Sequence, residues 1–259
     1  MLTALEPPRR SADTSTSVGK ALSMLDAFLG SSTTSLGVSE IARRACVAKS
    51  TAHRLLIVLE SHGLVRRIGD RWLPGTQLFR IGNAVSICRP HRLRDQALPH
   101  MQHLYVETHA MVNLAVLHQA QVLYVEKLAS RETIDSPATV GGCLPIHSTA
   151  LGKAMLAHSG PDLFDSVVAG GLRARTTRTI TSGAVLAGEL AQIRRVGFAL
   201  DQQETKVGLV CAAVPILRER RVVGAISLSL DVRRGLPQQH VPRLRRVAEA
   251  IAGSLLVDD

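Results

Sequence analysis

Five neighbouring residues carry side chains of the kinds that bind DNA: Lys49, Ser50, Thr51, His53 and Arg54. Lysine and arginine pair with phosphates or with guanine O6 and N7, and serine and threonine hydroxyls donate hydrogen bonds to phosphates or base edges. Further arginines flank the cluster on both sides: Arg43, Arg44, Arg66, Arg67 and Arg71. These residue types at this density predict a nucleic-acid contact surface.

The apolar residues around the cluster predict the elements that present it. Within residues 49–62 they follow the i, i+3, i+4, i+7 spacing of a helix: Ala52, Leu55, Leu56 and Leu59. A shorter helix precedes it, with Ser39 as the expected N-cap and Cys46-Val47 as the turn. Two basic strands around Gly69-Asp70 follow it. Helical spacing alone also fits an ordinary solvated helix, but helix, turn, helix and basic hairpin in this order favour a winged helix-turn-helix.

Composition and charge limit the class of protein. The chain has 259 residues, 46% of them hydrophobic, which is enough for one large core or two smaller ones. Residues 1–90 hold 12 Lys and Arg against 6 Asp and Glu, which is +6 of the total charge of +10 and suits a part that meets phosphate. The four cysteines lack Cys-x-x-Cys spacing. We expect no membrane span, a disordered tail over residues 1–16, and a cytoplasmic protein.

The second part of the chain alternates between predicted strands and helices. A linking helix is expected over residues 77–88 and a long amphipathic helix over 91–109. Further elements are predicted as strands at 111–118, 121–129, 208–217 and 221–231, and as helices at 148–158, 183–196 and 237–256. This alternation predicts an α/β domain behind a mostly helical N-terminal domain.

Four stretches resemble the IclR family of bacterial transcriptional regulators: SVGKALSMLDAF, KSTAHRLLIVLESHGLV, LPIHSTALGKAMLA and GFALDQQETKVGLVCAAVPI. The resemblance implies a winged helix-turn-helix domain over residues 17–75, a linking helix over 76–90 and a GAF-like α/β effector domain over 91–259. It also implies a homodimer or dimer of dimers on double-stranded operator DNA, and a small organic acid as effector. No cofactor is expected.

The same resemblance places the effector pocket at seven residues: Ala150, Leu151, Asp201, Leu209, Cys211, Ser227 and Ser229. The strand period is compatible, because residues two apart share one face of a strand, as Ser227 and Ser229 do. Backbone N–H groups at the helix start near Ala150 could receive a carboxylate, and Asp201 a ligand hydroxyl or a cation. As an alternative, the leucine and cysteine are ordinary core and the serines ordinary strand residues.

Three positions depart from the family pattern. Cys46 stands in the helix-turn-helix turn where the family commonly has glycine, and Ala48 stands where proline is common. Leu230-Asp231 replaces a frequent Gly-Pro. If Cys46 adopts the left-handed conformation, it costs about 1 kcal/mol there.

Other kinds of chemistry fit parts of the sequence less well. Gly152-Lys153 suggests a phosphate loop, but His147 and Ala154 occupy two positions that the motif requires as glycine and as serine or threonine. Cys143, His147 and Asp201 could form a nucleophile, base and orienter, although their spacing does not demand it. A metal-responsive regulator is the alternative function, because four histidines lie along the predicted 91–109 helix: His91, His100, His103 and His109. We expect a sequence-specific DNA-binding repressor or activator rather than an enzyme or a metal protein.

Overall fold

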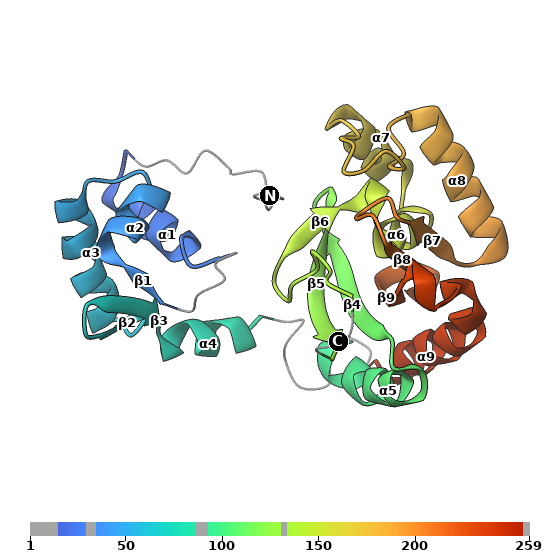
Figure 1. Cartoon of the computed structure of the whole chain (residues 1–259), viewed down its shortest axis with the longest axis horizontal. Helices are drawn as coiled ribbons and strands as arrows, with labels where there is room; N and C mark the ends of the chain where they lie inside the picture. The colour runs from blue at the N-terminus through green and yellow to red at the C-terminus, as the bar shows by residue number, and fades with distance from the viewer. Residues whose placement is uncertain (1–14, 30–34, 86–92, 131–133, 256–259) are drawn as a thin grey trace. The chain divides into compact units, whose positions relative to one another are not determined.

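The computed structural model describes residues 15–29, 35–85, 93–130 and 134–255 (Figure 1). The chain divides into two compact units, Met1–Cys88 and Arg89–Asp259. The boundary between the units lies within the range 76–90 predicted for the linking helix. In the part of the chain that the structure describes, no helix is both long enough and apolar enough to cross a membrane.

The first unit combines helices with a small antiparallel sheet of order β1-β3-β2. Its elements are α1 (Ser17–Asp26), β1 (Leu36–Gly37), α2 (Val38–Arg44), α3 (Lys49–Ser61), β2 (Val65–Ile68), β3 (Arg71–Pro74) and α4 (Thr76–Asn83). The core lies between the helices and the sheet, and its largest side chains are fully buried: Met24, Ile41, Leu56 and Trp72. This is the predicted winged helix-turn-helix.

The start of α2 differs from the sequence-based expectation. The helix begins at Val38 with Gly37 in the N-cap position, so the prediction that Ser39 is the N-cap was wrong. Gly37 is still paired with Arg71 in the β1–β3 ladder. The chain therefore passes directly from a strand into the helix, and Ser39 falls in the first helical turn.

Two residues with positive φ end the helices of the motif. Cys46, after α2, has φ 55°, and Gly63, after α3, has φ 67°. The N–H of Val47 donates to the carbonyl of Ala42 at 3.0 Å, and the N–H of Leu64 to that of Leu59 at 2.9 Å, which closes each turn. Gly63 is the C′ residue of α3 as predicted. Cys46 adopts a conformation that glycine tolerates better.

The second unit is built on a six-stranded antiparallel sheet of order β6-β5-β4-β9-β8-β7. The strands are β4 (Met111–His118), β5 (Gln121–Leu128), β6 (Cys143–Pro145), β7 (Ala199–Gln202), β8 (Leu209–Arg218) and β9 (Arg221–Asp231). The main helices are α5 (Leu93–Thr108), α6 (Ala150–Leu156), α7 (Pro161–Ala169), α8 (Gly183–Val196) and α9 (Val241–Ser254). A 3₁₀ turn, η4 (Pro237–His240), precedes α9.

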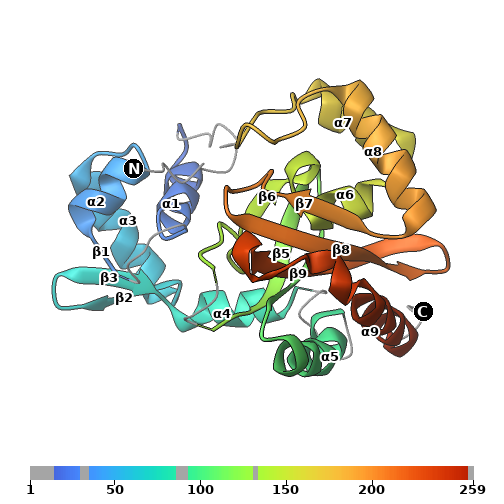
Figure 2. The ribbon, with the colours of Figure 1, turned by 45° about the vertical axis from the view of Figure 1, so that its right-hand side comes forward.

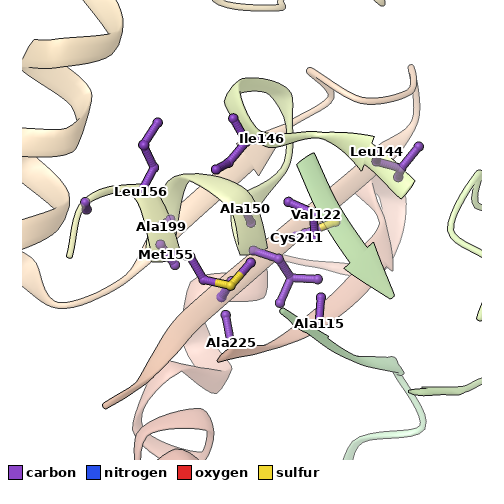
Figure 3. Packing of buried hydrophobic residues seen from close by; sticks show 14 of the residues in the cluster. Ala115, Val122, Leu144, Ile146, Ala150, Met155, Leu156, Ala199, Cys211 and Ala225 are labelled. Atoms are coloured by element: carbon purple, nitrogen blue, oxygen red, sulfur yellow. The ribbon is translucent and has the colours of Figure 1, made fainter. Parts of the chain in front are cut away.

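Helices cover both faces of this sheet (Figure 2). Helices α5 and α9 pack on each other and on one face, while α6 packs on the other face, with α8 against α6. Ala150 and Met155 of α6 belong to the apolar cluster that also holds Ala115, Cys211 and Ala225 of the sheet (Figure 3). This α6 side of the sheet is the one that carries the predicted effector residues.

Candidate functional site

Helix α3 presents two chemically different faces. Ala52, Leu56 and Leu59 are buried in the core of the first unit. The predicted DNA-contact side chains of α3 lie outside that core. Thr51 is half-buried, and the other four are exposed: Lys49, Ser50, His53 and Arg54. A recognition helix needs this division, because one face must anchor it while the other remains free for the major groove.

The arginines of α2 are already engaged within the protein. Arg43 donates to both carboxylate oxygens of Glu40 at 2.7 and 2.9 Å, and Arg44 donates to Glu40 at 2.6 Å. Hydrogen bonds from these two arginines lower the pKa of Glu40 to about 2. Arg44 also donates to the carbonyl of Ala27 at 3.0 Å, which ties α2 to the end of α1. Arg44 therefore stabilises the packing of α2 against the end of α1.

Of the arginines predicted for the wing, two have side chains that are hydrogen-bonded to other described residues of the protein, and one does not. Arg67 donates from Nε to the carbonyl of Gly69 at 2.8 Å, and its guanidinium lies 5.7 Å from the centre of the Trp72 ring. Arg71 donates to Oγ and the carbonyl oxygen of Ser35 at 2.8 and 2.6 Å. Within the described residues, three of the predicted cations have side chains without a hydrogen bond or ion pair: Lys49, Arg54 and Arg66.

In the second unit, one cavity brings together all seven residues predicted for the effector pocket. They come from α6, β7, β8 and β9: Ala150, Leu151, Asp201, Leu209, Cys211, Ser227 and Ser229. The lining leaves about 10 Å³ for the centre of a water molecule, roughly what a single water requires. Both polar and apolar side chains line this small space.

Strand register explains why residues distant in sequence meet there. Cys211 of β8 lies directly between Asp201 of β7 and Ser229 of β9. In the adjacent row, Ser227 of β9 pairs with Asn113 of β4. Directly paired residues in an antiparallel sheet point to the same face. These side chains therefore form a polar patch in the middle of the face that packs against α6.

Asp201 is the acidic group of the cavity and is 1% exposed. Its Oδ1 accepts hydrogen bonds from the backbone N–H groups of Glu204 at 2.6 Å and Thr205 at 3.3 Å. Burial raises the pKa of Asp201, and these hydrogen bonds together with Lys153 oppose that shift only in part. The carboxyl group is thus fixed in position while its charged form is disfavoured.

The start of α6 forms another wall of the cavity. Thr149 caps the helix, its Oγ1 accepting from the N–H of Gly152 at 3.0 Å. The N–H groups of Ala150 and Leu151 belong to the first turn, where a helix offers no internal partner. A Cβ on Gly152 would lie 2.1 Å from the carbonyl oxygen of Ile146. Close packing of the helix on the preceding turn therefore accounts for the glycine of the Gly-Lys pair without any phosphate loop.

Lys153 is fully buried behind this wall. Its Nζ lies 2.5 Å from Oε1 of Glu204 and 3.0 Å from Oε1 of Glu189, whose side chain is 35% exposed. Burial raises the pKa of Glu204, and the ammonium group opposes that rise. The lysine thereby joins α6 to α8 and to the turn that positions Asp201.

Comparison with known proteins decides the family. Residues 17–69 match the family described as the IclR helix-turn-helix domain, and residues 85–254 match the bacterial transcriptional regulator IclR C-terminal family. The chain belongs to the IclR family of transcriptional regulators. It is a DNA-binding regulator with an N-terminal helix-turn-helix domain and a C-terminal α/β domain.

Several IclR relatives are similar over most of their length. The transcriptional repressor IclR of Escherichia coli (strain K12) is 31% identical over 84% of this chain and 81% of its own length. The regulator BhcR of Paracoccus denitrificans is 35% identical over 76% of this chain and 70% of its own. Among solved structures, an IclR homologue from Microbacterium hydrocarbonoxydans, complexed with 4-hydroxybenzoate, superimposes with TM-score 0.84. It is 29% identical and covers 93% of this chain and 99% of its own.

The catalytic arrangement considered from the sequence is not assembled in this IclR chain. Cys143 lies on β6 and Asp201 on β7, which are the two opposite edges of the sheet. His147 Nε2 lies 3.1 Å from the carbonyl oxygen of Arg173, and burial lowers the pKa of this imidazole. Among the described residues, no hydrogen bond joins any two of these three side chains.

The histidines give no support to the metal-responsive alternative. Among the described residues, no three His, Cys, Asp or Glu side chains are grouped so that they could hold a metal ion. His103 Nε2 lies 3.3 Å from Oε1 of Glu107, one turn along the same helix. His91 lies outside the described residues.

Several cavity residues of this IclR domain were not predicted from the sequence. Asn113, Tyr124, Thr149 and Thr205 also line the cavity. Asn113 had a detectable signal, since it is the single strongly polar residue inside the apolar run MVNLAVL of a predicted strand. A polar side chain in such a run is either exposed or held by specific partners.

Proposed function

We propose that α3 enters the major groove of operator DNA and that the cavity of the second unit binds a small organic acid that changes operator affinity. The observation that carries this proposal is the meeting of Asp201, Cys211, Ser227 and Ser229 at one cavity in a chain whose other unit is a helix-turn-helix. A ligand alters DNA binding only through different affinities for two states of the protein.

On the DNA side, the proposal rests mainly on Lys49, Thr51 and Arg54 of α3 and Arg66 of the wing. The three cations have no partner among the described residues, so phosphate contact breaks no internal bond. His53 and Ser50 lie beside them as secondary contacts. Arg43, Arg44, Arg67 and Arg71 remain within the proposed surface, but DNA contact by these arginines competes with the hydrogen bonds they already make.

On the effector side, support comes from the chemistry of the cavity wall. The first-turn N–H groups of Ala150 and Leu151 suit a carboxylate, and the hydroxyl-bearing sheet face suits polar groups of the ligand. The complex of the Microbacterium hydrocarbonoxydans relative with 4-hydroxybenzoate supports an organic acid for this chain. Because the cavity has space for about one water, ligand binding requires its lining to shift, and this shift is the proposed source of the signal.

We further propose that the regulator is a homodimer that acts as a repressor. Helix α4 buries none of its residues, and Phe79 and Ile81 are 73% and 52% exposed. On α1, Val18 and Leu22 are 70% and 56% exposed. Exposed apolar helix faces favour association, and a dimer spaces two recognition helices by about 34 Å for one face of DNA. The Escherichia coli relative is described as a repressor.

The test is a titration of the full chain against a labelled duplex from upstream of its own gene. The expected affinity falls steeply as salt rises, because counterions are released on binding. An unrelated duplex of equal length should bind much more weakly, and a bound acid should change affinity for the upstream duplex alone. Equal affinity for both duplexes would overturn the operator proposal. Affinity unchanged by any acid that binds the protein would overturn the effector proposal.

A further inference from the structure

The amide side chain of Asn113 has an unused hydrogen-bonding atom inside the cavity. Asn113 is 2% exposed and lies on the central strand β4. Its Nδ2 donates to Oγ of Ser229 at 3.2 Å and to Oγ of Ser227 at 3.4 Å. Its Oδ1 is buried and has no partner among the described residues. A buried acceptor without a donor loses its hydration and gains nothing in return, so the position invites a donor from a ligand.

The neighbouring serines narrow the kind of group that fits. Each accepts the amide N–H through its oxygen, so its own hydroxyl hydrogen remains to be donated. Ser229 lies directly opposite Cys211 in the β8–β9 ladder, so its hydroxyl group has the Cys211 sulfur beside it as an acceptor. The Ser227 hydroxyl remains to serve a ligand acceptor. A ligand group here should therefore donate to Asn113 and accept from Ser227.

We propose that Asn113, with Ser227, selects effectors that carry a hydroxyl group. A hydroxyl donates and accepts at once, whereas a carboxylate only accepts, a methyl group does neither, and an ammonium group only donates. Because a hydroxyl group does both, it also fits the site if the Asn113 side-chain amide is rotated by 180°, which exchanges its oxygen and nitrogen. The inference rests on the proposed function of the cavity and identifies the effector as a hydroxy acid.

The position of Asn113 gives this selection a geometric basis. Asn113 and Ser227 form a directly opposed pair on β4 and β9, while the start of α6 bounds the same cavity from the helix side. A short hydroxy acid bound with its carboxylate toward Ala150 and Leu151 presents its hydroxyl to the sheet. The carboxylate then contributes affinity common to all acids, and Asn113 contributes the discrimination between them.

The test measures dissociation constants by calorimetry on the full chain for two series of acids. One series is lactate, propionate and alanine, and the other is 4-hydroxybenzoate, benzoate and 4-aminobenzoate. In at least one series, the dissociation constant of the hydroxylated acid should be lower by about tenfold or more than that of the acid with hydrogen in place of the hydroxyl group. This ratio corresponds to the net free energy of one hydrogen bond. In Asn113→Val this ratio should fall below about threefold.

Two further measurements separate selection from a structural role. The thermal midpoint of Asn113→Val should stay close to that of the wild type, because the loss of the two hydrogen bonds to Ser227 and Ser229 is offset by the removal of a buried acceptor without a donor. If that variant does not fold, Ser227→Ala should show the same loss of discrimination. Equal affinity for hydroxylated and plain acids, or the amino acid binding best, overturns the hydroxyl assignment and leaves the effector proposal standing. No binding by any of the six acids overturns both.

Discussion

The buried ammonium group of Lys153 lies 2.5 Å from a carboxylate oxygen of Glu204. This pair connects the helix that forms one wall of the cavity with the turn that holds Asp201 by its backbone. The second carboxylate oxygen of Glu204 is buried without a hydrogen bond among the described residues. The ammonium group of Lys153 is therefore the main group that stabilises the negative charge of Glu204. Stability and the shape of the cavity should therefore depend on the same ion pair.

Replacing Lys153 by methionine should destabilise the protein by about 3 to 5 kcal/mol, because it leaves Glu204 buried without a counter-charge. Chemical denaturation of the purified variant measures this change. The double variant Lys153→Met/Glu204→Gln should recover part of the loss, since both charges are then absent.

The surface pair between Lys206 and Asp135, with Nζ and Oδ2 2.7 Å apart, provides the matched control. Lys206→Met should cost at most about 1 kcal/mol, because solvent screens that pair. Equal losses in Lys206→Met and Lys153→Met would contradict the role assigned to burial.

Asp201 should make the protein less stable as the pH rises. Burial raises the pKa of Asp201 in the folded state. The stability that its protonated form contributes is therefore complete below the ordinary aspartate pKa of about 3.9 and is lost as pH rises through the folded pKa. Asp201→Asn keeps an oxygen for the N–H groups of Glu204 and Thr205 but never ionises. Its thermal midpoint should exceed that of the wild type at pH 7, and the difference should shrink toward pH 4.

Asp231 supplies a control of opposite sign. The side chain of Arg233 hydrogen-bonds to Asp231 and holds its pKa below the usual range. Its stabilising effect is present above the ordinary pKa and disappears as the pH falls. Asp231→Asn should therefore be slightly less stable than the wild type at pH 7. If both variants shift the midpoint in the same direction at pH 7, the assignment for Asp201 is wrong.

The recognition helix can be tested by removing single charges. Lys49→Ala and Arg54→Ala should each weaken operator binding and reduce the slope of log affinity against log salt by about one for each phosphate that is no longer bound. Fluorescence anisotropy at several salt concentrations measures both quantities. Arg178→Ala removes the same charge from an exposed position in the second unit and should leave both unchanged. A slope unaltered by Lys49→Ala and Arg54→Ala would contradict the proposed pose of α3.

Periodicity predicted the longer elements well because each carries enough apolar repeats to define a face. Helix α3 ends within one residue of the predicted limit, and β9 agrees with the predicted strand. Helix α4 ends at Asn83, short of the predicted Cys88, and residues 86–92 lie outside the described part. The strands β6 and β7 escaped prediction because three or four residues are too few to show a period.

The cavity was predictable only in part, for a physical reason. Residues of the family motifs, such as Ser227 and Asp201, could be named in advance because the resemblance supplied them. Asn113 enters the cavity through strand pairing across more than 100 residues of sequence, as its pairing with Ser227 shows. No pattern within a single segment of the sequence predicts the register between β4 and β9. The Lys153–Glu204 pair was missed because charged residues are rarely buried, so a lysine on a short helix suggests an exposed position.

Cys46 lies at φ 55° in the turn between α2 and the recognition helix. A substitution at this position should make the protein more stable. Cys46→Gly removes the steric cost of a side chain in the left-handed conformation and should raise stability by up to about 1 kcal/mol. Gly63 has φ 67° after α3, and a Cβ there would meet Cβ of Gln77 at an ordinary 3.5 Å. Gly63→Ala should therefore lose about 1 kcal/mol through backbone strain alone. Denaturant midpoints of the two variants should move in opposite directions. A loss of stability in Cys46→Gly would mean that the thiol stabilises the turn, and the weak contact from Sγ to the carbonyl oxygen of Arg43 at 3.9 Å would be its source.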